Sequence, residues 1–210
     1  TTFLLPVQAS NHPIYNPSLD YSVYLSQPFF FVLFQVLILL ITVYAVGIEI
    51  KFRTADEWLF VAKGNMVTAV LGKLLPYTII FILIGWLANY VMFGILHIPF
   101  QGSWLLMNML TALFVVATQA LGLFLFSLFP AISLIISIVS MVGSLGATLS
   151  GVTFPVTNMY PLVRDASYLF PVRHFTEMMQ NMLYGGSGFI YLWPSVVILC
   201  IFPLLAFVLL

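Results

Sequence analysis

Between residues 49 and 65 the sequence reads EIKFRTADEWLFVAKGN, and long apolar runs flank this stretch on both sides. Three of the six acidic residues and three of the six basic residues of the chain lie within it. A cluster of charges between two apolar runs is typical of a water-exposed connector between two membrane spans. The rest of the chain can be placed relative to this connector.

The connector also carries the signals of a short helix over residues 54–63. Thr54 and Glu57 fit the capping-box pattern, and Gly64 is a natural C-terminal stop. The apolar positions share one helical face and are Ala55, Trp58, Leu59 and Ala62. We expect an amphipathic helix at the membrane surface, although a solvated loop that ends the two spans fits the pattern equally well.

The composition indicates a membrane protein. Hydrophobic residues make up 62% of the 210 residues and charged residues 6%, where a soluble domain has about 25% charged residues. The net charge is zero and there is no basic patch, which argues against a nucleic-acid partner. Cys200 is the single cysteine and lies in an apolar run, so it says nothing about the redox compartment.

The apolar runs predict five transmembrane helices, at about residues 28–47, 67–96, 104–129, 131–152 and 191–210. We therefore expect an all-α polytopic membrane protein. Residues 1–27 are rich in turn formers and are interpreted as a loop or the end of an extracytoplasmic domain. Because the sequence lacks a starting Met and ends inside an apolar run, we expect it to be a fragment or to lack its N-terminal part.

Residues 153–187 predict a helical hairpin that dips into, or lies on, the far membrane surface. Three prolines divide it, Pro155, Pro161 and Pro171. One face of the helix after the last proline is apolar, with Phe175, Met178, Met179, Met182 and Leu183. The opposite face is polar and is expected at the membrane–water interface, with Arg173, His174, Glu177, Gln180 and Asn181.

The basic residues orient the chain. The connector side has four of them, Lys51, Arg53, Lys63 and Lys73. The hairpin side has two, Arg164 and Arg173. The positive-inside rule then makes the connector cytoplasmic and places residues 1–27, the loop at 97–103 and the hairpin outside.

No set of residues predicts a catalytic or metal centre. His12, His97 and His174 lack metal-ligand spacing, and no nucleophile or phosphate-loop motif is present. His174 with Glu177 is the best pair, and we interpret it as a helix face rather than a site. The strongly polar side chains inside the spans are interpreted as helix–helix contacts and are Gln35, Asn89, Asn108 and Gln119. A transporter of this kind would need energy from a partner.

Small and hydroxyl residues recur every fourth position in the fourth span. Two rows can be traced, Gly143, Ala147 and Gly151, and Ser140, Ser144 and Thr148. Such spacing lets another helix approach closely. Packing within the monomer, a contact between subunits and a substrate path all fit this pattern.

This arrangement resembles the permease subunit of ABC-2-type exporters at three places. Residues 15–21, YNPSLDY, look like the end of the family's extracellular domain. Residues 49–59 resemble its Glu-rich cytoplasmic connector followed by Gly-Thr-x-Glu-x-Leu; Thr54 and Asp56 match, and Arg53 stands where Gly is usual. Residues 150–161 and 169–175 are similar to the pattern Ser-Gly-x-x-x-Pro…Pro…Asn-Pro-x-x-x-Phe before the last helix, although an Arg common later in that pattern is absent.

The resemblance implies six helices in a full subunit, a cytoplasmic coupling helix at 54–63 and an extracytoplasmic hairpin at 153–187. It implies a homo- or heterodimer of permeases in the bacterial inner membrane, on two cytoplasmic ATPase subunits, with room for a periplasmic adaptor. ATP and Mg²⁺ would bind the ATPase, so this chain would hold no cofactor and would not be an enzyme.

The resemblance also implies roles for single residues. ATPase coupling would fall to Glu49, Arg53, Thr54, Asp56, Glu57, Trp58 and Leu59. The translocation path would include Gln35, Ser140, Ser144 and Thr148. The outer hairpin that caps this path would depend on Pro155, Pro161, Pro171 and Phe175.

We expect export of a hydrophobic or amphipathic substrate, a drug or a lipid, because the path would be wide, apolar and uncharged. A permease for polysaccharide or lipid-linked glycan is the alternative substrate class. Two other classes are a membrane scaffold that transports nothing, and an intramembrane enzyme acting on lipids through His174 and Glu177.

Overall fold

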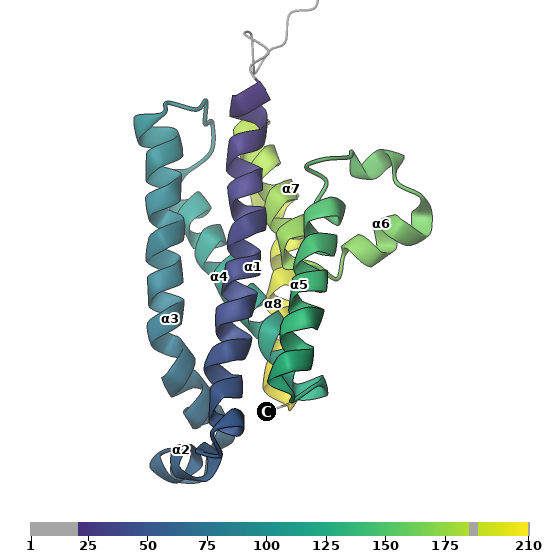
Figure 1. Ribbon diagram of the computed structural model, residues 1–210. Coiled ribbons are helices and arrows are strands. Elements are labelled where there is room, and N and C mark those ends of the chain that lie inside the picture. The colour runs from purple at the N-terminus through teal and green to yellow at the C-terminus, as the bar shows by residue number, and fades with distance from the viewer. Residues whose placement is uncertain (1–20, 185–188, 210) are drawn as a thin grey trace, which may run out of the picture.

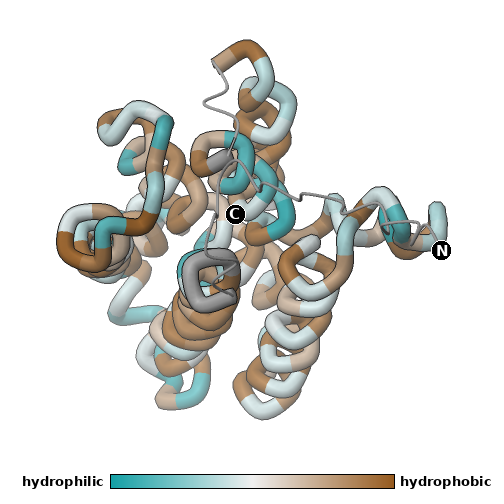
Figure 2. Tube along the Cα trace, turned by 90° about the horizontal axis from the view of Figure 1, so that it is seen from above, coloured by the Kyte–Doolittle hydropathy of each residue, from teal (hydrophilic) through white to brown (hydrophobic). Residues whose placement is uncertain are grey.

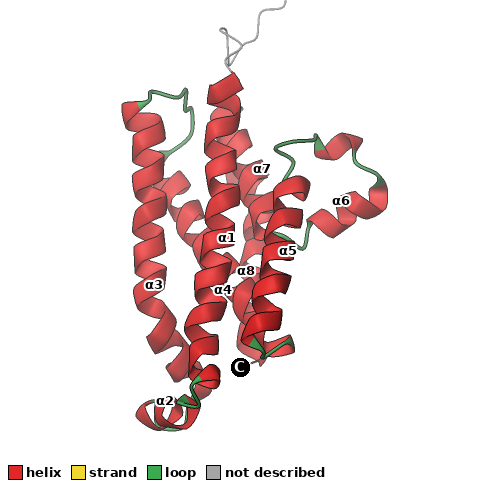
Figure 3. Ribbon diagram, viewed as in Figure 1, coloured by secondary structure: helices red, strands yellow, loops and turns green. Residues whose placement is uncertain are grey.

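The computed structural model describes residues 21–184 and 189–209, and the predictions for residues 1–20 lie outside this range. The described residues form helices and no strand (Figure 3). In chain order the elements are α1 (Tyr21–Lys51), α2 (Ala55–Val61), α3 (Met66–Asn89), η1 (Tyr90–Ile95), α4 (Trp104–Leu128), α5 (Ile132–Leu149), η2 (Val156–Asn158), α6 (Pro161–Ser167), α7 (Pro171–Tyr184) and α8 (Phe189–Leu209).

Five helices are long and apolar enough to cross a membrane, which confirms the predicted all-α polytopic architecture. The segments are Leu25–Lys51, Met66–Ile95, Trp104–Leu128, Ile132–Leu149 and Phe189–Val208. Seen from above, these helices are predominantly hydrophobic along their lengths (Figure 2). The chain is therefore a multi-pass membrane protein.

Two spans differ from their predicted limits for a local reason. The first was expected at residues 28–47, but α1 runs from Tyr21 to Lys51, and the first left-handed residue after it is Arg53. The fourth was expected to reach Val152, but α5 ends at Leu149, shortly before Gly151 with its φ of 87°. A left-handed residue ends a helix because it cannot continue the right-handed turn.

Helix α4 lies at the centre of the bundle and packs against α1, α3, α7 and α8. Helices α3, α1 and α5 stand in front of it, and α2 closes the lower ends of α1 and α3 (Figure 1). We call this lower end the connector end and the opposite end, where α7 terminates, the hairpin end. The end of α8 returns to the connector end (Figure 1).

Glycines allow α1 and α5 to approach closely. A Cβ atom at Gly143 would lie 2.7 Å from Val36 Cγ2, and one at Gly47 would lie 2.8 Å from Ile132 Cγ1. The row that contains Gly143 therefore serves packing within the monomer at this position. The second row of α5 faces outward, because Ser140, Ser144 and Thr148 are all exposed.

Helices α3 and α4 are joined by side-chain hydrogen bonds. Asn89 Nδ2 donates to Asn108 Oδ1 at 3.2 Å and to Thr111 Oγ1 at 3.0 Å. Nearer the connector, Thr78 Oγ1 donates to Gln119 Oε1 at 2.7 Å. These bonds confirm the prediction that Asn89, Asn108 and Gln119 hold helices together.

The hairpin divides into an exposed and a buried helix. Helix α6 stands beside α5, away from the bundle (Figure 1), whereas α7 packs against α1, α4 and α8. The hairpin therefore dips into the bundle. The expectation of a polar face of α7 at the water interface is wrong for Arg173 and His174, which are 7% and 0% exposed. Arg173 Nη1 pairs with Glu177, and His174 Nε2 lies 3.0 Å from the carbonyl oxygen of Tyr168, whereas Arg173 Nε and His174 Nδ1 have no partner among the described residues.

The close approach of α1 and α5 gives a first prediction. Replacing Gly143→Val should lower the free energy of unfolding by about 1–3 kcal/mol, because the added methyl groups meet Val36 in a packed core. Gly72→Val is the matched control, since a Cβ there has no described atom within 4 Å. Denaturant titrations in detergent micelles would measure both variants, and equal losses would contradict this account of the packing.

Candidate functional site: the connector junction and the buried hairpin helix

Helix α2 forms where the sequence predicts it, but its cap is different. Thr54 occupies the N-cap position without a side-chain capping bond, so the predicted capping box is wrong. Its hydroxyl instead donates to the carboxylate of Glu49 at the end of α1. The ionised carboxylate gives the hydroxyl a charge-assisted hydrogen bond, which draws the side chain toward α1.

Left-handed residues fix both ends of the connector. Arg53 and Lys63 each have a φ of 57°, and Gly64 has a φ of 76°. The N–H of Gly64 donates to the carbonyl of Leu59 at 2.8 Å, which closes the helix end as Gly64 predicted. The left-handed conformation favours glycine, so Arg53 adopts a backbone conformation that a residue with a Cβ atom seldom takes.

Lys73 joins the three helices that meet at the connector. Its ammonium group pairs with the carboxylate of Glu49 on α1 and lies 5.3 Å from the ring centroid of Trp58 on α2. The side chains of Lys73 and Glu49 are 18% and 20% exposed, so the pair is partly shielded from water. We call Glu49, Thr54, Trp58 and Lys73 the connector junction. The sequence placed Lys73 at the membrane surface but did not identify its partners.

The two faces of α2 have different surroundings. Trp58 and Leu59 are half-buried and face the bundle, as the apolar stripe predicts. Asp56 and Glu57 are exposed. Phe60 and Val61 were missing from the predicted coupling residues, yet they are 84% and 83% exposed. The connector therefore presents a small apolar patch beside two carboxylates, outside the bundle.

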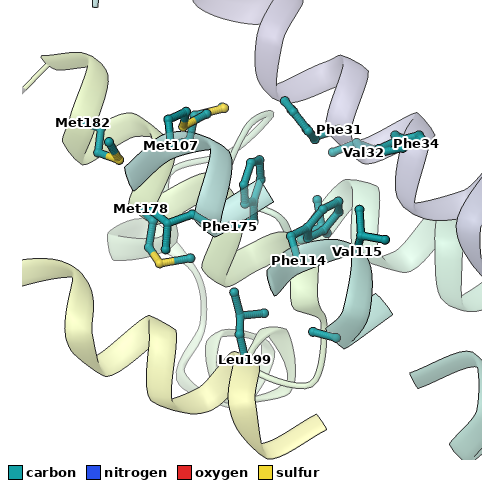
Figure 4. Packing of buried hydrophobic residues seen from close by; sticks show 14 of the residues in the cluster. Phe31, Val32, Phe34, Met107, Phe114, Val115, Phe175, Met178, Met182 and Leu199 are labelled. Carbon is teal, nitrogen blue, oxygen red and sulfur yellow. The ribbon is translucent and has the colours of Figure 1, made fainter. Parts of the chain in front are cut away.

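At the hairpin end, Phe175 anchors α7 in the core. Its ring lies 4.5 Å from that of Phe31 on α1 and 4.6 Å from that of Phe114 on α4, measured between centroids (Figure 4). Of the hairpin prolines, Pro155 and Pro161 are exposed and Pro171 begins α7. The four predicted hairpin residues thus form two pairs: Pro155 and Pro161 are exposed, whereas Pro171 and Phe175 lie on the buried helix α7.

Gln35 does not occupy the exposed surface that the path prediction would suggest. It is fully buried, and its Oε1 accepts a hydrogen bond of 2.9 Å from the N–H of Val172 at the start of α7. The other three predicted path residues are exposed, and each bonds to a carbonyl of its own helix; these are Ser140, Ser144 and Thr148.

A polar cluster connects α7 to α8 and to the α6–α7 turn. Arg173 Nη1 lies 3.3 Å from Glu177 Oε2, which also accepts from Ser195 Oγ at 3.3 Å. His174 Nε2 lies 3.0 Å from the carbonyl of Tyr168. His174 and Glu177 therefore have different partners, and the structure does not join them as the enzyme alternative requires. Among the described residues, no group of three His, Cys, Asp or Glu side chains could hold a metal ion.

Comparison with known proteins gives a family match and several relatives. Residues 3–210 match the family model described as ABC-2 family transporter protein. The chain is 31% identical over 105 residues to the inner membrane transport permease YhhJ of Escherichia coli (strain K12), which covers 49% of this chain and 27% of YhhJ. No solved structure matches.

Two further relatives come from the same organism. The probable multidrug ABC transporter permease YbhS is 26% identical over 139 residues, covering 64% of this chain and 36% of YbhS. The probable multidrug ABC transporter permease YbhR is 24% identical over 181 residues, covering 86% of this chain and 49% of YbhR. The chain thus spans about half or less of the length of these relatives.

The connector junction gives a second prediction. Lys73→Met removes the partner of Glu49 and the cation beside Trp58, so α2 should open more often. Amide hydrogen exchange in residues 55–61 should become roughly tenfold to a hundredfold faster, given the value of hydrogen bonds to charged groups. Lys63→Met is the control, because Lys63 is exposed and forms no ion pair with described residues. Equal acceleration in both variants would argue against the junction.

The cluster on α7 gives a third prediction. Glu177→Gln should destabilise the protein by roughly 3 kcal/mol, because it leaves the Arg173 guanidinium, 8% exposed, without its anion. Arg173→Met should cost roughly 1 kcal/mol, since Glu177 is 42% exposed and can be hydrated. The double variant should recover much of the loss caused by Glu177→Gln. Unfolding titrations in micelles test this order, and a larger loss for Arg173→Met would refute it.

Proposed function

This chain belongs to the ABC-2 family of transporter proteins, and on that premise we propose that it is the permease of an ATP-driven exporter whose ATPase is a separate cytoplasmic subunit. Family membership confirms the predicted resemblance, and it confirms that the chain is a transport protein and not an enzyme. The ATPase partner, the direction of transport and the substrate class belong to the proposal.

The observation that carries this proposal is the apolar patch on α2. Phe60 and Val61 are more than four-fifths exposed on a connector whose composition indicates a watery environment. Exposed apolar side chains grouped beside polar ones are typical of protein contact surfaces. We assign ATPase docking to Phe60 and Val61, flanked by Asp56 and Glu57. A complementary partner would offer an apolar socket with basic residues at its rim.

The other predicted coupling residues hold α2 in place in this proposal and do not contact the ATPase. Trp58 and Leu59 face the bundle, so they hold α2 in place rather than touch the ATPase. Glu49 and Thr54 tie the start of α2 to α1, and Lys73 ties it to α3. A push on the docking patch therefore reaches two spans. Arg53 sets the left-handed bend that turns α1 into the connector.

The proposed orientation of the protein in the membrane follows from the distribution of its basic residues. Lys51, Arg53 and Lys63 lie at the connector end with the Lys73 junction, whereas α6 with Arg164 lies beyond the opposite half of α5 (Figure 1). The positive-inside rule makes the connector end cytoplasmic. The ATPase would then bind on the cytoplasmic side of an inner membrane, and the hairpin would cap the outer side.

The substrate path would run along the outward faces of α1 and α5. The exposed residues of α1 include Phe29, Leu33 and Leu37, and those of α5 include Ser140, Ser144 and Thr148. This surface is apolar with weakly polar hydroxyls and carries no charge, which suits a hydrophobic or amphipathic drug or lipid. A second permease, identical or related, would form the opposite wall.

Relatives support the drug class over the glycan alternative, because two of them are named as probable multidrug permeases. A lipid-linked glycan would instead require a path with many hydrogen-bonding groups. Stimulation of ATP hydrolysis by a lipophilic dye but not by a lipid-linked glycan would separate the two substrate classes.

The docking patch gives a fourth prediction. The double substitution Phe60→Asp, Val61→Asp should reduce the amount of ATPase that co-purifies with the permease at least about tenfold, because charge replaces the central apolar contact. Thermal stability of the permease should not change, since both side chains are exposed. Quantitative affinity purification of the tagged, full-length permease from its native membrane measures the effect.

Leu162→Asp on α6 is the matched control, because Leu162 is 73% exposed and lies on the hairpin. It should leave the recovered ATPase at the level of the unmodified protein. Undiminished recovery with the double substitution would refute docking through α2. Absence of any ATPase from the unmodified preparation would refute the exporter function itself.

A further inference from the structure

We propose that Gln35 is a positioning residue that holds the start of the buried hairpin helix α7 against α1. Movement of the connector would then reach α7 through α1. The inference rests on the export function proposed above, because it names the contact through which movement of α2 reaches the other half of the bundle. It assigns Gln35 a role other than lining the path.

The first argument is the start of α7, which lies inside the bundle. The first N–H groups of a helix have no partner within that helix, and a buried one without a partner is destabilising. Pro171 has no N–H, and the N–H of Arg173 bonds to the carbonyl of Phe170 at 3.1 Å. The N–H of Val172 donates to Gln35 Oε1 at 2.9 Å, and both residues are 0% exposed. Gln35 thus caps α7 from another helix.

The second argument is that α5 leaves little room for Gln35 to turn away. A Cβ atom at Gly146 would lie 2.7 Å from Gln35 Nε2 and 3.2 Å from Phe170 Cδ1. Gln35 of α1 and Phe170, which precedes α7, therefore both lie against the backbone of α5 at Gly146, where α5 has no side chain. One turn earlier in α1, Phe31 packs on Phe175 of α7. Helix α1 therefore holds α7 at two successive turns, through one polar and one aromatic contact.

The third argument is continuity. Glu49 of the connector junction lies on α1 as well, roughly 21 Å beyond Gln35 at about 1.5 Å per residue. No proline interrupts α1 between the two residues, because its one proline, Pro28, lies on the other side of Gln35. A displacement of the connector junction along or across α1 is therefore passed to the start of α7 rather than absorbed between them.

The test follows the start of α7 with a thiol probe. The full-length permease with its ATPase subunit is reconstituted in proteoliposomes, carrying Val172→Cys in a background in which Cys200 and every other cysteine of both subunits is replaced by Ser. A water-soluble maleimide then labels the introduced thiol, without nucleotide and after trapping with ATP and vanadate. We expect the labelling rate to differ between these two states, because α7 follows α1. A rate that does not respond to nucleotide would overturn the inference.

Gln35→Met keeps the size of the side chain and removes the acceptor for Val172. It should raise labelling without nucleotide by about fivefold to a hundredfold and abolish the nucleotide response, because the start of α7 detaches. Gln119→Met is the matched control, since this buried amide bonds to Thr78 of α3 and not to α7. Co-purified ATPase and basal ATP hydrolysis should be unchanged in both variants.

A second variant separates the proposed effect of Gln35→Met from an effect of misfolding. Gly146→Ala keeps the amide of Gln35 but displaces it, and it should produce the same labelling, whereas Gly72→Ala should not. If Gln35→Met labels and responds as Gln119→Met does, the positioning role is wrong while the exporter function stands. If the unmodified permease neither retains an ATPase nor supports ATP hydrolysis, the exporter function is refuted instead.

Discussion

A polar group buried in a membrane bundle is destabilising unless it has a partner, and at several places in this protein the partner lies on a different helix. Asn89 and Gln119 bond across α3 and α4. Lys73 and Glu49 meet at the connector junction. Gln35 meets the free N–H of Val172. Each pair joins two different segments, so the polar contacts connect helices that apolar packing alone would leave free to slide.

The sequence was sufficient for the spans, the connector and the direction of its apolar face. These features depend on local composition, because a run of apolar residues spans the hydrocarbon core wherever its partners lie. The stripe that contains Trp58 and Leu59 faces the bundle for the same reason. The sequence left three uses open for the small residues of α5, and the structure assigns packing within the monomer to Gly143, whereas Ser140 is exposed.

The burial of α7 could not be predicted in the same way. Its amphipathic pattern is the one expected of a helix at an interface, with Arg173 and His174 on the polar face. What decides the outcome is contact with residues far away in the sequence: Phe175 packs on Phe31 and Phe114, and the N–H of Val172 donates to Gln35. The exposure of Phe60 was missed because a helix of seven residues has too few positions to show a second apolar patch.

Two spans leave the connector junction, and they differ in how they can transmit movement. Helix α3 carries Pro76 less than one turn after Lys73, and a proline inside a helix removes a backbone hydrogen bond and permits bending there. Helix α1 has no such break between Glu49 and Gln35. A force applied at the junction can thus be relieved in α3 near its origin, whereas α1 carries it to the start of α7. In the proposed mechanism, this asymmetry makes α1 the helix that links movement at the two ends of the bundle.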